Sequence, residues 1–326
     1  MDSFSNFVLL EIAVESFKLF FGVGVPKNEK KAIEICLESS VQGDQLAQAF
    51  QHYYGWETQI SVIEAKKNIK EIIKEKEKMI SLYGKEYLSY AYNLKGILIK
   101  GIKIKKAIKC FEISMELSGN PDSMFRLAEL HYFADLSEPE QDFKKAFEFY
   151  KKSANKNHLN ALLCVAFFYK RGEEGYFEKC IKKSIFYFEK CAQLNCSTAY
   201  CQLSLYYKNG DENEELEKDI DKAAFFMLKS FLFQKNNENQ KLSKELLEFI
   251  STNRIEWKPE YHIYWNASSS LNTFYDFKSD LDQQVFIVLC ISKFRFSSNN
   301  FSVRSLLVKG ISLLVIKFLC HFKHII

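Results

Sequence analysis

The sequence predicts an all-α fold of about six stacked helix-turn-helix units, followed by a small helical module at the C-terminus. Three observations predict it. A short lysine-rich phrase recurs six times along the 326 residues, at steps of 36 to 39 residues, and a fixed period of this size is typical of stacked repeat arrays. Glycine and proline number only 12 and 4, which favours helices over turn-rich β structure. Phenylalanine and tyrosine number 30 and 17, as expected where each helix layer fills the space against the next.

The recurring phrase marks the second helix of each unit, which we name helix B. It starts at Lys30, Lys66, Lys105, Lys144, Lys182 and, in blurred form, Asp221. Its third residue is small in every copy: Ala32, Asn68, Ala107, Ala146, Ser184 and Ala223. Apolar residues follow one and four positions later, for example Ile108 and Phe111, and these positions share one face of a helix. Small residues such as Ser114 come one turn further on, so a neighbouring helix can approach closely.

A second pattern upstream predicts the first helix of each unit, helix A. A small residue recurs at steps of 38 in the three clearest copies: Ala128, Ala166 and Ser204. An aromatic pair follows within one turn and a glycine ends the pattern, as in Phe168, Tyr169 and Gly172. Glycine suits this end because the residue after a helix often takes a positive φ. Two helices cannot bury both apolar stripes alone, so each unit must pack on the next.

The order aromatic–glycine, loop, Lys-Ala, aromatic, Lys-small-small resembles the Sel1-like repeat, a relative of the tetratricopeptide repeat. The best matches are Phe20-Phe21-Gly22-Val23-Gly24-Val25 with Lys31-Ala32, Phe168-Tyr169-Lys170-Arg171-Gly172 with Lys190-Cys191-Ala192, Tyr206-Tyr207-Lys208-Asn209-Gly210 with Lys222-Ala223, and Lys145-Ala146 with Lys152-Ser153-Ala154. The resemblance covers about residues 5–235 and implies a right-handed α-solenoid that works as a scaffold or adaptor for other proteins.

The second and fourth units depart from this pattern. The second lacks the Lys-Ala pair and has Glu75-Lys76 where small residues are expected, so its helix B is expected to run from about Ile63 to Leu82. The fourth has no glycine after Tyr132-Phe133.

After the array we expect a linker and a capping helix over residues 236–255, and a helical module over residues 256–326. The last helix, Ser305 to Phe322, is apolar but contains Lys309 and Lys317. A charge near the middle of a membrane span costs about 2.5–3.5 kcal/mol, so we expect a buried or partner-binding helix and no membrane span. The alternative function places the activity here: the module recruits a ubiquitin ligase or a membrane, and the repeats bind the substrate.

Three features could suggest a metal or phosphate site. Cys191, Cys196 and Cys201 step by five, so one helix face cannot carry all three thiols. The turn Gly22–Val25 lacks the Gly-Lys-Ser/Thr ending of a phosphate loop and follows a helix where that motif needs a strand. The acidic run Asp211–Asp221 has no glycine at its sixth position, so it does not fit a calcium loop. We expect no metal, no cofactor and no small-molecule substrate.

His262 lies near Glu260 and Trp265, and the three could form a small polar cluster. A lone histidine beside aromatic residues is more often structural. We therefore expect no catalytic residues and a protein that is not an enzyme.

The charge balance gives little support for nucleic-acid binding. Lysine and arginine total 45 against 41 acidic residues, a net charge of +4 that is well mixed along the chain. The densest basic stretch is Lys95, Lys100, Lys103, Lys105, Lys106 and Lys109. A solvated helix face explains it best, and an acidic protein segment or another anionic surface is the alternative.

The cysteines and the N-terminus predict a cytoplasmic protein. The nine cysteines are odd in number and irregular in spacing, and Cys36, Cys110, Cys164 and Cys191 fall at packing positions. The N-terminus lacks a basic region, and acidic residues interrupt its apolar stretch, so we expect no secretory signal.

We therefore predict a non-catalytic scaffold or adaptor that binds a peptide or helix of another protein on the surface of the A helices. A preformed concave surface loses little conformational entropy on binding. Polar residues on helix A outside the packing stripe are the candidates for contact with the partner: Arg126, Glu129, His131, Lys170, Gln202 and Lys208.

Overall fold

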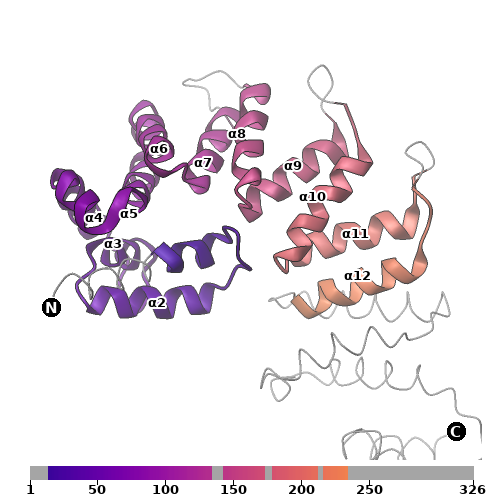
Figure 1. Ribbon diagram of the computed structural model, residues 1–326, viewed down its shortest axis with the longest axis horizontal. Helices are drawn as coiled ribbons and strands as arrows, with labels where there is room; N and C mark the ends of the chain where they lie inside the picture. The colour runs from indigo at the N-terminus through magenta and orange to yellow at the C-terminus, as the bar shows by residue number, and fades with distance from the viewer. Residues whose placement is uncertain (1–13, 134–141, 173–177, 212–215, 234–326) are drawn as a thin grey trace, which may run out of the picture. The chain divides into compact units, whose positions relative to one another are not determined.

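The computed structural model describes residues 14–133, 142–172, 178–211 and 216–233, and within them helices form all regular structure apart from two isolated β-bridges (Figure 1). The A helices are 14–21, α3 (Gln45–Tyr54), α5 (Lys76–Ile99), α7 (Pro121–Tyr132), α9 (Leu159–Arg171) and α11 (Ser197–Asn209). The B helices are α2 (Glu29–Val41), α4 (Val62–Lys74), α6 (Ile104–Ser118), α8 (Phe143–Asn155), α10 (Ile181–Gln193) and α12 (Ile220–Phe233).

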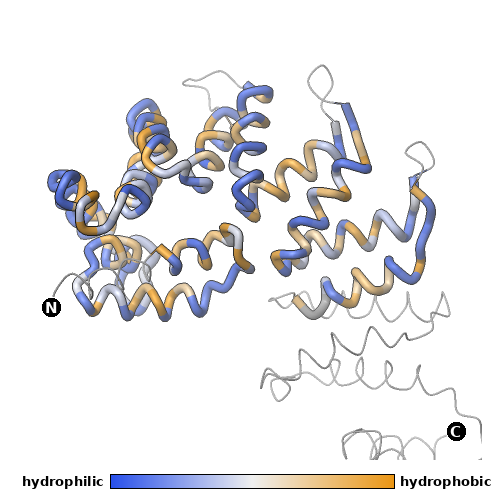
Figure 2. Tube along the Cα trace, viewed as in Figure 1, coloured by the Kyte–Doolittle hydropathy of each residue, from blue (hydrophilic) through white to orange (hydrophobic). Residues whose placement is uncertain are grey.

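The chain divides into two compact units, residues 1–218 and 219–326, and α12 is the described helix of the second. Within the first unit every two consecutive helices from α2 to α11 pack on each other, as Figure 1 shows. Apolar and polar residues alternate along each helix (Figure 2), so each helix has a side to bury. The predicted all-α repeat fold is confirmed. The handedness of the array remains a prediction, and the expectations for residues 236–255 and 256–326, including Glu260, His262 and Ser305–Phe322, lie outside the described residues.

The small reference residues of helix B lie in the seams between helices. Ala32, Ala107, Ala146 and Ser184 have no exposed surface, and Ala223 is 1% exposed. Each follows an N-cap position by four residues: in α2 and α8 the caps Asn28 and Asp142 accept the N–H of Lys31 and Lys145. The cap and the buried small residue therefore set the start and the rotation of each B helix.

The second unit is shifted relative to the prediction. Its reference position is Ala65, which is fully buried, while Asn68 is only half-buried. Ser61 caps α4 four residues before Ala65, as the other caps do. The KKNI phrase is therefore out of phase by three residues, because the stripe that packs is Ala65, Ile69 and Ile72.

The long charged helix predicted from Ile63 to Leu82 is also wrong. The helix α4 ends at Lys74, and the next helix begins at Lys76. That helix, α5, is interrupted at Gly84, whose φ of 73° and ψ of 173° are not helical. The part of α5 after Gly84 is the helix A that packs in the array.

One backbone hydrogen bond closes the connection from helix A to helix B in five units. The N–H of the helix B cap donates to a carbonyl near the end of helix A: Asn28 to Leu19 (3.0 Å), Ser61 to His52 (2.8 Å), Lys103 to Ile99 (2.9 Å), Asp142 to His131 (3.0 Å) and Cys180 to Tyr169 (2.8 Å). The bond forms although the loops differ in length. It therefore identifies equivalent positions in units whose sequences do not align by eye.

A pair of backbone hydrogen bonds joins the first unit to the turn between the fourth and fifth units, which are not its neighbours. After the helical segment 14–21, the chain turns at Gly22, and this turn meets the turn between α8 and α9. The N–H of Gly24 donates to the carbonyl of Asn157 (3.0 Å), and the N–H of Leu159 donates to the carbonyl of Gly22 (3.1 Å). In most repeat arrays each unit contacts only the next. We call this contact, Gly22–Gly24 with Asn157–Leu159, the clasp.

Candidate protein-binding surface on the A helices

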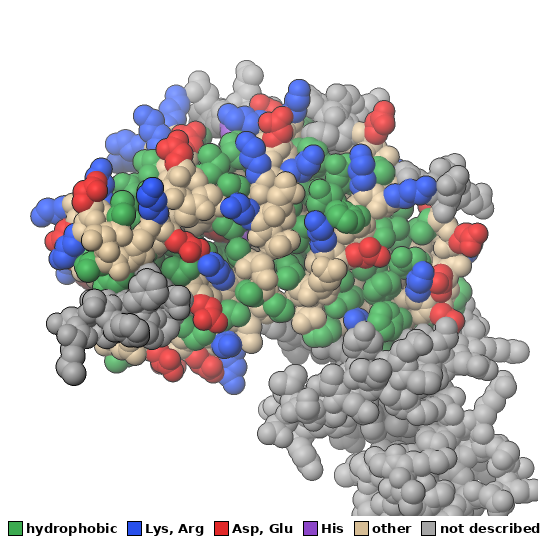
Figure 3. All heavy atoms as spheres, in the orientation of Figure 1, with side chains coloured by type: hydrophobic (Ala, Val, Ile, Leu, Met, Phe, Trp, Pro, Cys, Tyr) green, Lys and Arg blue, Asp and Glu red, His purple; other side chains and the backbone are tan. Residues whose placement is uncertain are grey.

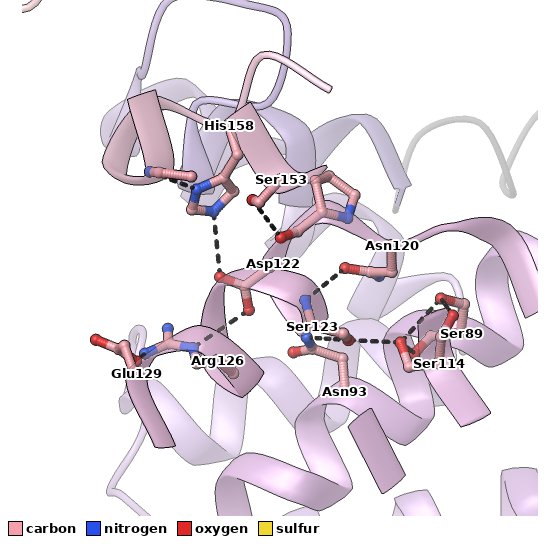
Figure 4. Close-up of polar contacts among 12 residues, drawn as sticks. Ser89, Asn93, Ser114, Asn120, Asp122, Ser123, Arg126, Glu129, Ser153 and His158 are labelled. Atoms are coloured by element: carbon pink, nitrogen blue, oxygen red, sulfur yellow. Dashed lines mark hydrogen bonds and ion pairs between the residues drawn. The ribbon is translucent and has the colours of Figure 1, made fainter. Parts of the chain in front are cut away.

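A buried ion pair positions the first of the predicted partner-binding residues, Arg126 (Figure 4). Asp122 lies in the first turn of α7 and its side chain is 1% exposed. Its Oδ2 accepts from Nε of Arg126 at 3.4 Å, and its Oδ1 lies 3.3 Å from Nε2 of His158. Since Nδ1 of His158 accepts the N–H of Ala161, Nε2 carries the proton and donates to Asp122. The carboxylate therefore has a partner on each oxygen.

The charge of Asp122 is stabilised in the core. Burial by itself would raise the pKa of this carboxyl group, but the Arg126 guanidinium and the bond from His158 outweigh it and lower the pKa to about 2. The ion pair fixes Arg126, whose side chain is 20% exposed. One Nη1 hydrogen then donates to Oε2 of Glu129 at 3.1 Å. Two of the six predicted residues thus lie side by side on α7.

Arg126 and Glu129 form part of the wall of a pocket. Its volume is about 170 Å³, and it is lined by Lys100, Phe111, Arg126, Glu129, Leu130 and Phe133. Pockets that hold small-molecule ligands measure about 300–1,000 Å³. This pocket therefore has room for one side chain of a partner rather than for a cofactor.

A network of hydroxyl groups beneath this wall fixes α5, α6 and α7 to one another (Figure 4). Nδ2 of Asn93 donates to Oγ of Ser123 (2.7 Å), which donates to Oγ of Ser114 (2.7 Å). Oγ of Ser114 donates to the carbonyl of Ser89 (2.7 Å). The sequence pattern identified Ser114 by its size alone, and Asn93, Ser123 and the pair Asp122–His158 gave no signal, because their partners lie in other helices.

Lys170 and Gln202 are brought together from two successive A helices. Nζ of Lys170 on α9 donates to Oε1 of Gln202 on α11, and it lies 5.4 Å from the centre of the Tyr206 ring. Partial burial lowers the pKa of Lys170. Lys208, near the end of α11, is exposed. These residues make the A-helix surface continuous from one unit to the next.

His131 does not belong to this surface. It is 6% exposed, and its ring lies parallel to that of Phe149, with 5.8 Å between the centres. Burial lowers its pKa, and Nδ1 has no hydrogen-bond partner among the described residues. The expectation that its side chain lies outside the packing stripe is wrong, because residue 131 faces α8 instead.

The other sequence candidates take structural places. Cys36, Cys110 and Cys191 are buried and Cys164 is half-buried, as their packing positions indicated. Gly22 ends a helix, as expected. Where the structure is described, no three histidine, cysteine or acidic side chains are grouped to hold a metal ion.

The basic stretch is exposed at Lys100, Lys103, Lys105, Lys106 and Lys109. Lysine and arginine side chains gather over the region where Figure 1 places α6 (Figure 3). None of the described helices is both long and apolar enough to cross a bilayer.

Comparisons with known proteins find a repeat family and solved structures that this chain resembles. The Sel1 repeat model matches residues 19–44, 121–158 and 197–231. A Sel1 repeat protein from Oxalobacter formigenes superposes with a TM-score of 0.51 at 17% identity, covering 79% of this chain and 99% of that chain. A protective antigen of uropathogenic Escherichia coli strains that displays an SLR fold gives 0.41 at 16% identity, over 86% of this chain and 68% of that one. No curated protein matches the sequence. Three segments of this chain therefore match the Sel1 repeat, and its all-α repeat fold resembles that of a solved Sel1 repeat protein.

Proposed function

We propose that this protein is a non-catalytic scaffold or adaptor, active in the cytoplasm, that binds an extended segment of another protein along its A helices. Sel1 repeats generally mediate contacts between proteins, and the present proposal adds the surface. The observation that supports this proposal is the hydrogen bond from Lys170 to Gln202, because this bond joins two successive A helices. A segment of a partner can follow such a surface across several units.

The residues proposed for the contact differ from the predicted set by one. Arg126, Glu129, Lys170, Gln202 and Lys208 each have some exposed surface, whereas the side chain of His131 is buried. Aromatic side chains accompany them, for example Tyr206 beside Lys170. Aromatic and arginine side chains are enriched among the residues that dominate protein interfaces.

A quantitative pull-down with charge-reversed chains tests the proposal. The full-length chain is used as bait, alongside the double variant Lys170→Glu, Lys208→Glu and the single variant Lys208→Glu. Lys144→Glu is the matched control, because Lys144 is an exposed lysine on a B helix. Proteins retained by the native chain are expected to fall more than tenfold with the A-helix variants and to remain with the control. Circular dichroism confirms that each variant is folded. Partners that persist with both A-helix variants contradict the proposal.

A further inference from the structure

We propose that the pocket at Lys100 and Arg126 binds a carboxylate side chain, aspartate or glutamate, of the partner segment. The inference rests on the proposed function and specifies the chemistry of the ligand. It follows from a comparison of two equivalent pairs of side chains, one between the third and fourth units and one between the fifth and sixth.

The closing hydrogen bond identifies this position. The bond ends on the carbonyl of Ile99 in the third unit and of Tyr169 in the fifth, so Lys100 and Lys170 are equivalent. The bond of the fourth unit ends on His131, five residues after Arg126. In the sixth unit the step of 38 places Tyr207 in the same role, five residues after Gln202. The pair Lys100 and Arg126 therefore occupies the same positions in its two units as the pair Lys170 and Gln202 does.

The two sites differ in one respect. In the fifth and sixth units the lysine ammonium donates to the amide oxygen of Gln202. In the third and fourth units the corresponding side chain is Arg126, which has no acceptor atom and carries the same charge as Lys100. The space between them is the pocket of about 170 Å³. At one site Gln202 supplies an oxygen acceptor to the lysine, whereas at the other site the equivalent residue, Arg126, supplies none.

The donors of the pocket match a carboxylate. The side chain of Lys100 is exposed and forms no hydrogen bond or ion pair with any described residue. Nε and Nη1 of Arg126 are engaged with Asp122 and Glu129, while Nη2 has no partner among the described residues. Asp122 and Glu129 both offset the charge of Arg126, so Lys100 supplies the unpaired positive charge. A carboxylate that bridges Nζ of Lys100 and Nη2 of Arg126 would form charge-assisted hydrogen bonds to both.

The apolar part of the wall favours a protein ligand over a free anion. Phe133 is 66% exposed at the pocket, and Leu130 and Phe111 line it beside the charges. An acidic residue followed by an apolar residue, on an extended segment, would satisfy both halves of the site. The expected ligand is therefore a short acidic-apolar stretch of the partner.

A selection experiment tests this inference. Random dodecapeptides on phage are selected on the full-length chain, and the enriched peptides are synthesised with a fluorescent label. We expect an aspartate or glutamate next to an apolar residue in the enriched set. Lys100→Gln is expected to weaken binding of these peptides about tenfold, and Lys100→Glu to abolish it. Lys109→Gln, an exposed lysine on α6, is the matched control and should leave the affinity unchanged.

A double-mutant cycle identifies the bond. Replacing the acidic residue of the peptide by its amide should weaken binding to the native chain, with little further loss on Lys100→Gln. Peptides that bind the native chain and the Lys100 variants equally would overturn the carboxylate site and leave the proposed function standing. Displacement of the peptide by an equal concentration of a single-stranded RNA 12-mer would assign the pocket to phosphate and overturn it too. Selection of no peptide at all would overturn both.

Discussion

The candidate surface depends on Asp122, although the side chain of this residue is not exposed on it. The carboxylate is buried, yet it holds Arg126 in place from below and receives the ring N–H of His158. The sequence could not reveal this, because Asp122 and His158 are 36 residues apart and each lies at the start of its own helix. A polar residue near a helix N-terminus predicts capping, not a long-range partner.

The first prediction concerns Asp122→Asn. Removing one partner of a buried pair costs about 3–5 kcal/mol, so the variant should unfold at lower urea than the native chain. Glu116→Gln, at an exposed site on α6, is the control and should change little. Native-like stability of the Asp122 variant would show that the pair does not support the fold.

The second prediction is the pH dependence of the same pair. The pKa of Asp122 is lowered to about 2 from the ordinary 3.8. A lowered pKa in the folded state adds stability that is fully present above about pH 4 and is lost as the pH falls toward 2. The shift corresponds to about 2 kcal/mol. Urea unfolding of the native chain and of Asp122→Asn should therefore differ by that much less at pH 2 than at pH 6.

A third prediction concerns the close contact of Gly96 with Phe111. A Cβ atom at Gly96 would lie 2.5 Å from Cε1 of the buried Phe111 ring. Alanine usually stabilises a helix interior relative to glycine, but here the ring would have to move. We expect Gly96→Ala to lower the free energy of unfolding by about 1–3 kcal/mol. Gly101→Ala is the control, since nothing lies within 4 Å of its Cβ position.

The B helices with a clear repeat pattern were predicted correctly. The helix α4, whose KKNI phrase is out of phase with the repeat, was not. The B helices α2, α6, α8, α10 and α12 contain their reference residues as expected. In α4 the KKNI phrase imitates the repeat, but burial of Ala65 decides the rotation. Charged residues on an exposed helix face can change position without loss of packing. A charged motif therefore indicates which face of a helix is buried less reliably than a buried alanine does.

The N-caps allow a fourth prediction. Lys103 caps α6 without a side-chain hydrogen bond, unlike Asn28 and Asp142 in the equivalent places. An aspartate there could accept a first-turn N–H and would also suit the helix dipole. Lys103→Asp should raise the stability by about 1 kcal/mol in thermal unfolding. Lys109→Asp, in the middle of the helix, should give no such gain.

For the whole array, the clasp is the feature that sequence periodicity could not predict. A repeat pattern describes how each unit meets the next, whereas the clasp joins Gly22–Gly24 to a turn about 135 residues later. Its hydrogen bonds are formed by backbone atoms, so they restrict the residue type only at the glycines. The pattern Gly22-Val23-Gly24 indicated a turn and no more.

The fifth prediction compares two glycines of the clasp. Gly22 and Gly24 have φ values of 67° and 69°, so alanine is strained at both. At Gly22 a Cβ atom would also lie 3.1 Å from Cβ of Leu159, while Gly24 has nothing within 4 Å. Gly22→Ala should therefore expose the N–H of Leu159 to hydrogen exchange more than Gly24→Ala does. Equal exchange in the two variants would mean that Leu159 does not depend on this contact.

The clasp also limits how such a chain can grow by duplication. An extra helix pair inserted between residues 24 and 157 would separate the two turns, because it would move Asn157 along the stack. A pair added after Asn209 would leave both turns where they are. Lineages of this protein should therefore keep a constant number of helix pairs between the two turns and vary in length outside them.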